Sequence, residues 1–154
     1  MVMPHLFTFV PAWIRSRKAK RPELVFYDGH CGLCHWAVRF ILAQDRMGEA
    51  FRFASLESDT FRTALSEAVR ISLPDSLLVQ TDDGTILTRS AAVLHVMWRL
   101  GGMWRVLGIV VSLVPLTLRD KIYDAIARIR HRLFQAPAAS CPIIPVDLRV
   151  RFLP

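Results

Sequence analysis

The chain has 154 residues, the size of one ordinary domain, which argues against separate cofactor and substrate lobes. Apolar residues make up 53% and charged residues 21%, a composition that favours a folded core over extended disorder. The net charge of +7 divides into +5 over residues 1–22, −2 over residues 23–118 and +4 over residues 119–154. Because the central part is nearly neutral, we expect no groove for nucleic acid.

Residues 1–22 predict a basic, flexible leader. Its basic run follows its apolar stretch, which is the reverse of a secretory signal, so a cytoplasmic location is expected. The leader is interpreted as a solvated tail. A second interpretation is a membrane-surface anchor, in which Phe7, Phe9 and Trp13 enter the interface and the basic run contacts headgroups.

The first predicted elements alternate between strands and helices. Residues 24–27 form an apolar run, which predicts a buried strand that is closed by a turn at Asp28. From Cys34 onward, apolar residues recur at helical spacing, which predicts a helix that ends near Gly48. Residues 51–54 alternate as a second strand. A short helix then begins at Ser58 or Asp59 and buries three apolar residues, which are Phe61, Leu65 and Val69.

A hairpin and two helices follow. Residues 76–80 and 85–88 flank the turn signal Asp82-Asp83-Gly84, which predicts a β-hairpin. Ser90 can cap a helix that runs to Leu100, where Gly101-Gly102 ends it. Residues 104–114 form a more apolar helical stretch.

The last long helix begins near Thr117 and is amphipathic. One face is apolar and carries Leu118, Ile122, Ile126, Ile129 and Leu133. The other face is basic and carries Arg119, Lys121, Arg128, Arg130 and Arg132. We expect the apolar face to enlarge the core and the basic face to be solvated.

This order of elements is typical of one fold class. It predicts an α/β, thioredoxin-like β-α-β-α-β-β-α core with additional C-terminal helices. The domain would cover residues 23–135, and the Pro/Ala-rich residues 136–154 are predicted to be an irregular tail.

Cys31 and Cys34 form a C-x-x-C at the mouth of the first helix. One helical turn brings the two sulfurs together, and the unpaired N–H groups and positive dipole end favour a thiolate. Cys31 is therefore predicted to attack as the nucleophile and to form a mixed disulfide. Cys34 would then resolve it. With only three cysteines in the chain, a disulfide-stapled scaffold is not expected.

Four neighbours of the pair are candidate site residues. Gly32 lets the backbone of a partner approach closely. His30 and His35 either modulate the pKa of the pair, or are exposed without a role. Asp28 either accepts a proton from Cys34 or only shapes the turn.

A substrate groove is predicted by analogy with thioredoxin-fold proteins. These proteins place a cis-proline opposite the C-x-x-C, just before the hairpin. Pro74 holds that place in the order of elements, and Gly32 and Leu33 would complete the groove. Both isomers of the peptide bond before Pro74 remain open.

The segment Tyr27-Asp28-Gly29-His30-Cys31-Gly32-Leu33-Cys34 resembles the Y-D-G-x-C-x-x-C signature of the DCC family of thiol–disulfide oxidoreductases. The resemblance covers residues 23–153. Further matches are Pro74-Asp75-Ser76, Arg89-Ser90, Gly101-Gly102, Tyr123-Asp124, Arg130, Cys141-Pro142 and Arg151-Phe152. It implies a thioredoxin-like fold and dithiol exchange with protein or small-molecule thiols and disulfides. No organic cofactor is expected.

Two alternative functions remain open. Cys31 and Cys34 could join His30 or His35 and Cys141 in a zinc site, but the chain has no second C-x-x-C and no H-x-x-x-H, so we predict no metal. The apolar residues 104–114 and the basic face of the last helix could instead form a non-enzymatic module that binds a membrane or a partner protein. Cys141 is interpreted as an idle thiol or as a third redox sulfur.

Overall fold

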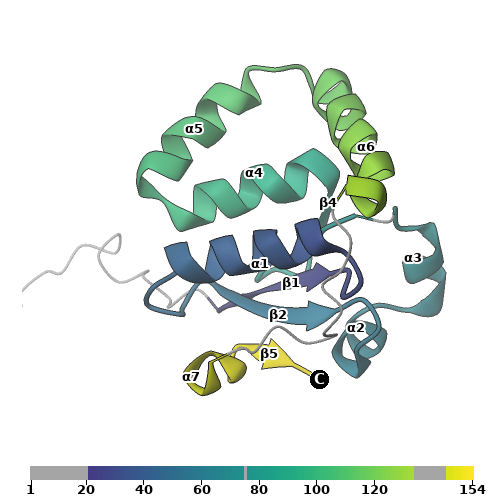
Figure 1. Ribbon diagram of the computed structural model, residues 1–154, viewed down its shortest axis with the longest axis vertical. Coiled ribbons are helices and arrows are strands. Elements are labelled where there is room, and N and C mark those ends of the chain that lie inside the picture. The colour runs from purple at the N-terminus through teal and green to yellow at the C-terminus, as the bar shows by residue number, and fades with distance from the viewer. Residues whose placement is uncertain (1–20, 75, 134–144) are drawn as a thin grey trace, which may run out of the picture.

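The computed structural model describes residues 21–74, 76–133 and 145–154 (Figure 1). Strands and helices alternate in the first half of the chain, and helices dominate the second half. The elements are β1 (Glu23–Tyr27), α1 (Gly32–Gln44), β2 (Phe51–Ser55), α2 (Asp59–Ala64), α3 (Glu67–Ser72), β3 (Leu78–Gln80), β4 (Ile86–Thr88), α4 (Arg89–Leu100), α5 (Gly102–Ser112), α6 (Leu116–Leu133), α7 (Val146–Arg149) and β5 (Phe152–Leu153).

In the described part of the chain, five strands form one sheet in the order β4-β3-β1-β2-β5. β1 pairs with β2 in parallel and with β3 in antiparallel orientation, and β3 and β4 form the hairpin. Successive side chains of a strand point to opposite faces. Val25 and Phe26 of the central strand β1 are both completely buried, so this strand is covered on both sides. Val25 faces the core under α1 and α4, whereas Phe26 packs against Phe61 of α2 on the other face.

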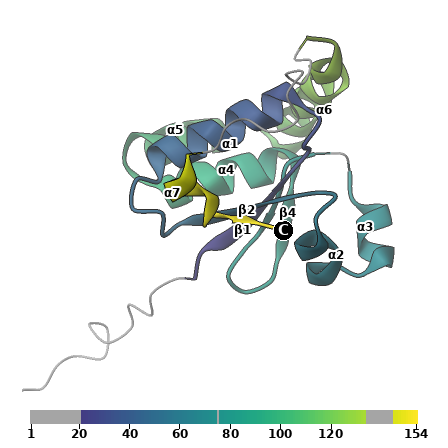
Figure 2. The same ribbon diagram turned by 60° about the horizontal axis from the view of Figure 1, so that its bottom comes forward.

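The helices are arranged around this sheet in the predicted order. Figure 1 shows α1 and α4 side by side over the sheet, and Figure 2 places α2 and α3 at the opposite end of the molecule from α5. The core follows β1-α1-β2-α2/α3-β3-β4-α4, with α5 and α6 added after it. The predicted fold class is confirmed: the chain has a thioredoxin-like α/β fold.

The single short helix expected after β2 is divided into α2 and α3. Ser58 caps α2 and accepts a hydrogen bond from the Phe61 N–H at 3.1 Å. Leu65 then adopts an extended conformation, which ends α2. Since α3 begins anew at Glu67, Val69 leaves the apolar face of α2 and is exposed, while Phe61 and Leu65 are buried as expected.

The described part of the predicted irregular tail contains regular structure. α7 leads into β5, which pairs with β2 in parallel. The buried guanidinium of Arg151 contacts the carboxylate of Asp45 and donates to the Asp45 carbonyl at 3.0 Å. The ion pair and the strand pairing together attach the C-terminus to the far edge of the sheet. The leader up to residue 20 lies outside the described residues.

α6 is rotated relative to the expectation from its sequence. Arg130, predicted on the solvated face, is only 3% exposed. Ile122, Ile126 and Ile129, predicted to be buried, are 45–51% exposed. The rotation occurs because polar groups on the inward face find partners there. For example, the Tyr123 hydroxyl accepts a hydrogen bond from the Leu77 N–H at 3.0 Å.

α5 is largely apolar, whereas α6 carries several charged side chains. Taken singly, no helix of the described residues is long and apolar enough to cross a membrane. α5 and the first fifteen residues of α6 satisfy that length and composition criterion only as a pair, and they are bent by 111°.

Candidate active site

Cys31 lies at the N-cap of α1, as the sequence predicts. Its backbone is extended, with φ −107° and ψ 116°, and its carbonyl accepts the first helical hydrogen bond from the His35 N–H at 3.1 Å. The Cys31 N–H donates to the Asp28 carbonyl at 3.3 Å, which closes the preceding turn. The Cys31 side chain is completely buried. A substrate therefore reaches this sulfur only after neighbouring groups move.

Cys34 lies one turn into α1 and its thiol contacts that of Cys31. Both are free thiols in the structure. Burial raises the pKa of Cys34 to about 12, and a negative charge on Cys31 together with the hydrogen bond between the two thiols adds to this effect. The positive charge of Arg130 and the backbone N–H of Asp28 act in the opposite direction on the Cys34 pKa.

Asp28 joins the loop before the pair to α6. One carboxylate oxygen accepts a hydrogen bond from the His30 N–H at 2.8 Å, and this bond shapes the turn. The other oxygen lies 3.7 Å from the guanidinium of Arg130. The structure therefore shows the turn-shaping contact that we considered for Asp28, and it adds an ion pair. Transfer of a proton between Cys34 and this carboxylate remains a prediction.

The two histidines occupy different environments. The Nε2 of His35 lies 2.7 Å from the Gly29 carbonyl, so this nitrogen carries the proton and donates it to the loop. The His30 ring lies 3.2 Å from the Glu57 carboxylate, and both side chains are largely exposed. His35 thus holds the loop against α1, whereas His30 lies at the surface.

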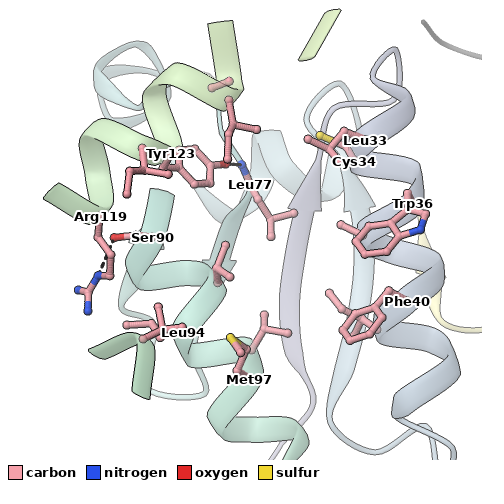
Figure 3. A pocket seen from close by; sticks show the side chains of 18 of the residues that line it. Leu33, Cys34, Trp36, Phe40, Leu77, Ser90, Leu94, Met97, Arg119 and Tyr123 are labelled. Atoms are coloured by element: carbon pink, nitrogen blue, oxygen red, sulfur yellow. Dashed lines mark hydrogen bonds between the residues drawn. The ribbon is translucent and has the colours of Figure 1, made fainter. Parts of the chain in front are cut away.

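An apolar cavity of about 540 Å³ opens beside Cys34 between α1, α4, α5 and α6. In Figure 3, Leu33, Cys34, Trp36 and Phe40 form one wall, and Tyr123, Leu77, Leu94 and Met97 lie across from them. The cavity is also lined by three polar residues, which are Ser90, Arg119 and Arg130.

Of the predicted groove residues, Leu33 lines this cavity, whereas Gly32 and Pro74 are not among the described lining residues. In the described residues every peptide bond is trans, including the one before Pro74. The contribution of Gly32 and Pro74 to substrate binding remains a prediction.

Arg130 and Tyr123 were missed as site residues. The periodicity of the helix groups Arg130 with the solvated basic residues. The spacing of residues along a helix does not show which face packs against the rest of the domain. Both residues nevertheless belong to the ordered matches to the family pattern, and that signal could have identified them.

The described residues contain no cluster of three or more His, Cys, Asp or Glu side chains that could hold a metal. Cys141, which the zinc alternative requires, lies outside the described residues.

A sequence model for the DCC1-like thiol-disulfide oxidoreductases matches residues 25–136. The chain belongs to this family. The uncharacterized protein YuxK of Bacillus subtilis (strain 168) is 33% identical over 132 residues, which cover 86% of this chain and 94% of that protein. A DCC family protein of Arabidopsis thaliana, described as chloroplastic, is 30% identical over 127 residues, which cover 79% and 73% of the two chains. No solved structure matches the chain.

Membership of the DCC1-like family agrees with the position of the cysteine pair. The matched range includes the pair, the cavity-lining helices and Arg130. It indicates a redox function with thiols or disulfides as the general class of substrate.

Proposed function

We propose that this member of the DCC1-like family catalyses thiol–disulfide exchange, with Cys31 as the nucleophile and Cys34 as the resolving thiol. The observation that carries the proposal is the contact between two free thiols at the N-terminus of α1, with Cys31 at the N-cap. The unpaired N–H groups and dipole at a helix N-terminus stabilise negative charge on the first sulfur.

The exchange proceeds in two balanced steps. The Cys31 thiolate attacks one sulfur of a substrate disulfide, a mixed disulfide forms, and the other substrate sulfur leaves as a thiolate. Cys34 then attacks Cys31, the mixed disulfide breaks, and the second substrate sulfur leaves. The Cys34 proton passes to a leaving thiolate. The substrate gains two electrons, and the pair becomes a disulfide.

The electrostatics of Cys34 suit the resolving step. Before the reaction, burial and the charge on Cys31 raise the pKa of Cys34 to about 12, so that this thiol stays protonated. When Cys31 enters a mixed disulfide it loses its charge, and this contribution to the Cys34 pKa disappears. Arg130, which lowers the pKa of Cys34, remains in place. Deprotonation of Cys34 thus becomes easier at the resolving step, when Cys34 attacks the mixed disulfide.

The test follows the masses of the reduced protein during reaction with glutathione disulfide, in a Cys141→Ser background that leaves only the pair. The unaltered pair should lose two hydrogens and release two glutathione molecules. Cys34→Ser should stop at a glutathione adduct on Cys31. Cys31→Ser should react at least about a hundredfold more slowly, because burial, the largest cause of the raised Cys34 pKa, remains in this variant and keeps the Cys34 thiol protonated at neutral pH.

Three results would contradict this assignment. One is a Cys34→Ser variant that forms no adduct. Another is an adduct that forms on Cys34 as fast as on Cys31, and the third is a pair that never closes to a disulfide. Equilibration of the pair with glutathione buffers then gives its reduction potential and hence the direction of exchange.

A further inference from the structure

The corner between α5 and α6 exposes an uncharged apolar segment. Residues 106–118, called the α5–α6 corner below, contain no charged side chain. Seven of their large apolar side chains are 43–78% exposed. These are Val106, Leu107, Ile109, Val110, Leu113, Leu116 and Leu118. Since isolated exposed apolar residues are ordinary but a continuous exposed set is not, the corner marks an interaction surface.

The exposed charges that flank the corner are positive. Arg105 precedes it, and Lys121 and Arg128 follow on the exposed side of α6. The two acidic residues of α5 and α6 are half-buried and paired: Asp120 accepts a hydrogen bond from the Ser90 hydroxyl, and Asp124 lies 3.2 Å from Arg89. Among the residues that the structure describes on these helices, every exposed charged residue is therefore basic, whereas Asp120 and Asp124 are half-buried.

The corner is also a projection. Figure 1 shows the connection between α5 and α6 at the top of the molecule, at the end opposite to β5 and α7. A protein partner would need a matching hollow for such a projection. A fluid lipid interface adapts to it, and exposed basic side chains attract anionic headgroups. The bend of 111° favours helices that lie at the interface over a membrane span.

We propose that the α5–α6 corner docks the protein on the surface of an anionic lipid bilayer. The apolar side chains of residues 106–118 enter the boundary between headgroups and acyl chains, while Arg105, Lys121 and Arg128 contact the headgroups. This interaction does not depend on the redox function. It is distinct from the contact expected from the leader, which up to residue 20 lies outside the described residues.

The test measures cosedimentation of the full chain with phosphatidylcholine vesicles that contain or lack phosphatidylglycerol. We expect binding to the phosphatidylglycerol vesicles that weakens with added salt. Val106→Asp combined with Leu113→Asp should weaken it at least about tenfold. The matched control is Ile71→Asp combined with Val150→Asp, which adds the same charge at side chains that are 79% and 73% exposed elsewhere. This control should bind as the unaltered chain does.

Circular dichroism and the rate of reaction with glutathione disulfide confirm that each variant is folded. The proposal is overturned if the unaltered chain does not bind the phosphatidylglycerol vesicles. Unchanged binding of the corner variant would overturn it as well and would assign the contact to the leader. A dimer that the corner variant converts to a monomer, without vesicle binding, would identify a second copy of the chain as the occupant.

Discussion

Arg130 connects the cysteine pair to the loop in front of it. Its guanidinium is buried, lies 3.7 Å from the Asp28 carboxylate and lowers the pKa of Cys34. A buried positive charge acts more strongly on a neighbouring thiol than an exposed one, because water screens it less. In the proposed exchange, Arg130 is a positioning residue that favours the Cys34 thiolate after Cys31 has reacted.

Replacement of Arg130 should slow the resolving step. In Arg130→Gln we expect the glutathione adduct on Cys31 to persist about tenfold longer at neutral pH, because fewer Cys34 thiols are ionised. The defect should shrink as pH rises. Rapid mixing of reduced protein with glutathione disulfide, followed by acid quench and mass analysis, measures the lifetime of the adduct. Arg128→Gln removes an exposed charge from the same helix and should have little effect. Equal lifetimes in the two variants would exclude the role of Arg130.

The buried thiol of Cys34 also links stability to pH. The folded dithiol binds the Cys34 proton more tightly than the unfolded chain, whose ordinary pKa is 9.0. The stabilising contribution is therefore complete below pH 9 and is lost as pH rises toward about 12. In reductant, the free energy of unfolding should fall relative to that of Cys34→Ser, by at most about 1.4 kcal/mol per pH unit. Urea unfolding at several alkaline pH values measures the difference, and parallel pH profiles would contradict the prediction.

At the scale of elements, α5 packs on α4 through Gly108. A Cβ atom at this position would lie 2.7 Å from Cδ1 of Trp98 and 3.4 Å from Cβ of Met97. The close approach explains why a glycine is found inside an apolar helix, where alanine is normally preferred. The contact orients α5, and with it the α5–α6 corner and one wall of the cavity beside Cys34.

The packing at Gly108 predicts a change of sign in a double-mutant cycle. Gly108→Ala should destabilise the protein by about 1 kcal/mol, because the free-energy cost of displacing the Trp98 indole exceeds the gain in helix propensity. In a Trp98→Ala background the same substitution should stabilise by roughly 0.5–1 kcal/mol, since only the propensity remains. Urea unfolding of the four proteins measures both values. A substitution that stabilises equally in the two backgrounds would show that Trp98 does not restrict this position.

The elements themselves were largely predictable from local patterns, but the orientation of α6 was not. β1, the hairpin and the N-terminus of α1 follow from alternation, turn residues and helix spacing. Either face of α6 could pack against the rest of the domain. Which face does so depends on partners that are distant in the sequence, such as the Leu77 N–H, which donates to the Tyr123 hydroxyl. Arg130 was therefore assigned to solvent, while the cysteine pair at the helix N-cap was located correctly.

At the scale of the whole molecule, the C-terminal segment adds the strand β5 at the edge of the sheet. It also forms an ion pair with Asp45, which lies 106 positions earlier in the chain. Arg151 is buried against Asp45, the residue that ends α1. The same carboxylate accepts hydrogen bonds from the N–H groups of Ala50 and Phe51, both at 3.2 Å. The Arg151 carbonyl accepts from the Phe53 N–H at 2.8 Å. One ion pair thus joins the end of α1, the start of β2 and the C-terminus.

Loss of this ion pair should weaken the whole domain. Arg151→Met leaves the buried Asp45 carboxylate without its cation, so we expect the free energy of unfolding to fall by about 3 kcal/mol. The matched substitution Arg62→Met removes an exposed ion pair to Asp59 and should cost about 0.5 kcal/mol or less. Urea unfolding compares the two. Hydrogen exchange at Phe53, whose N–H pairs with the C-terminal segment, should accelerate only in Arg151→Met, because β5 then separates from β2 more often. Similar losses of stability in the two variants, with Phe53 still protected, would mean that the C-terminal segment is held by strand pairing alone.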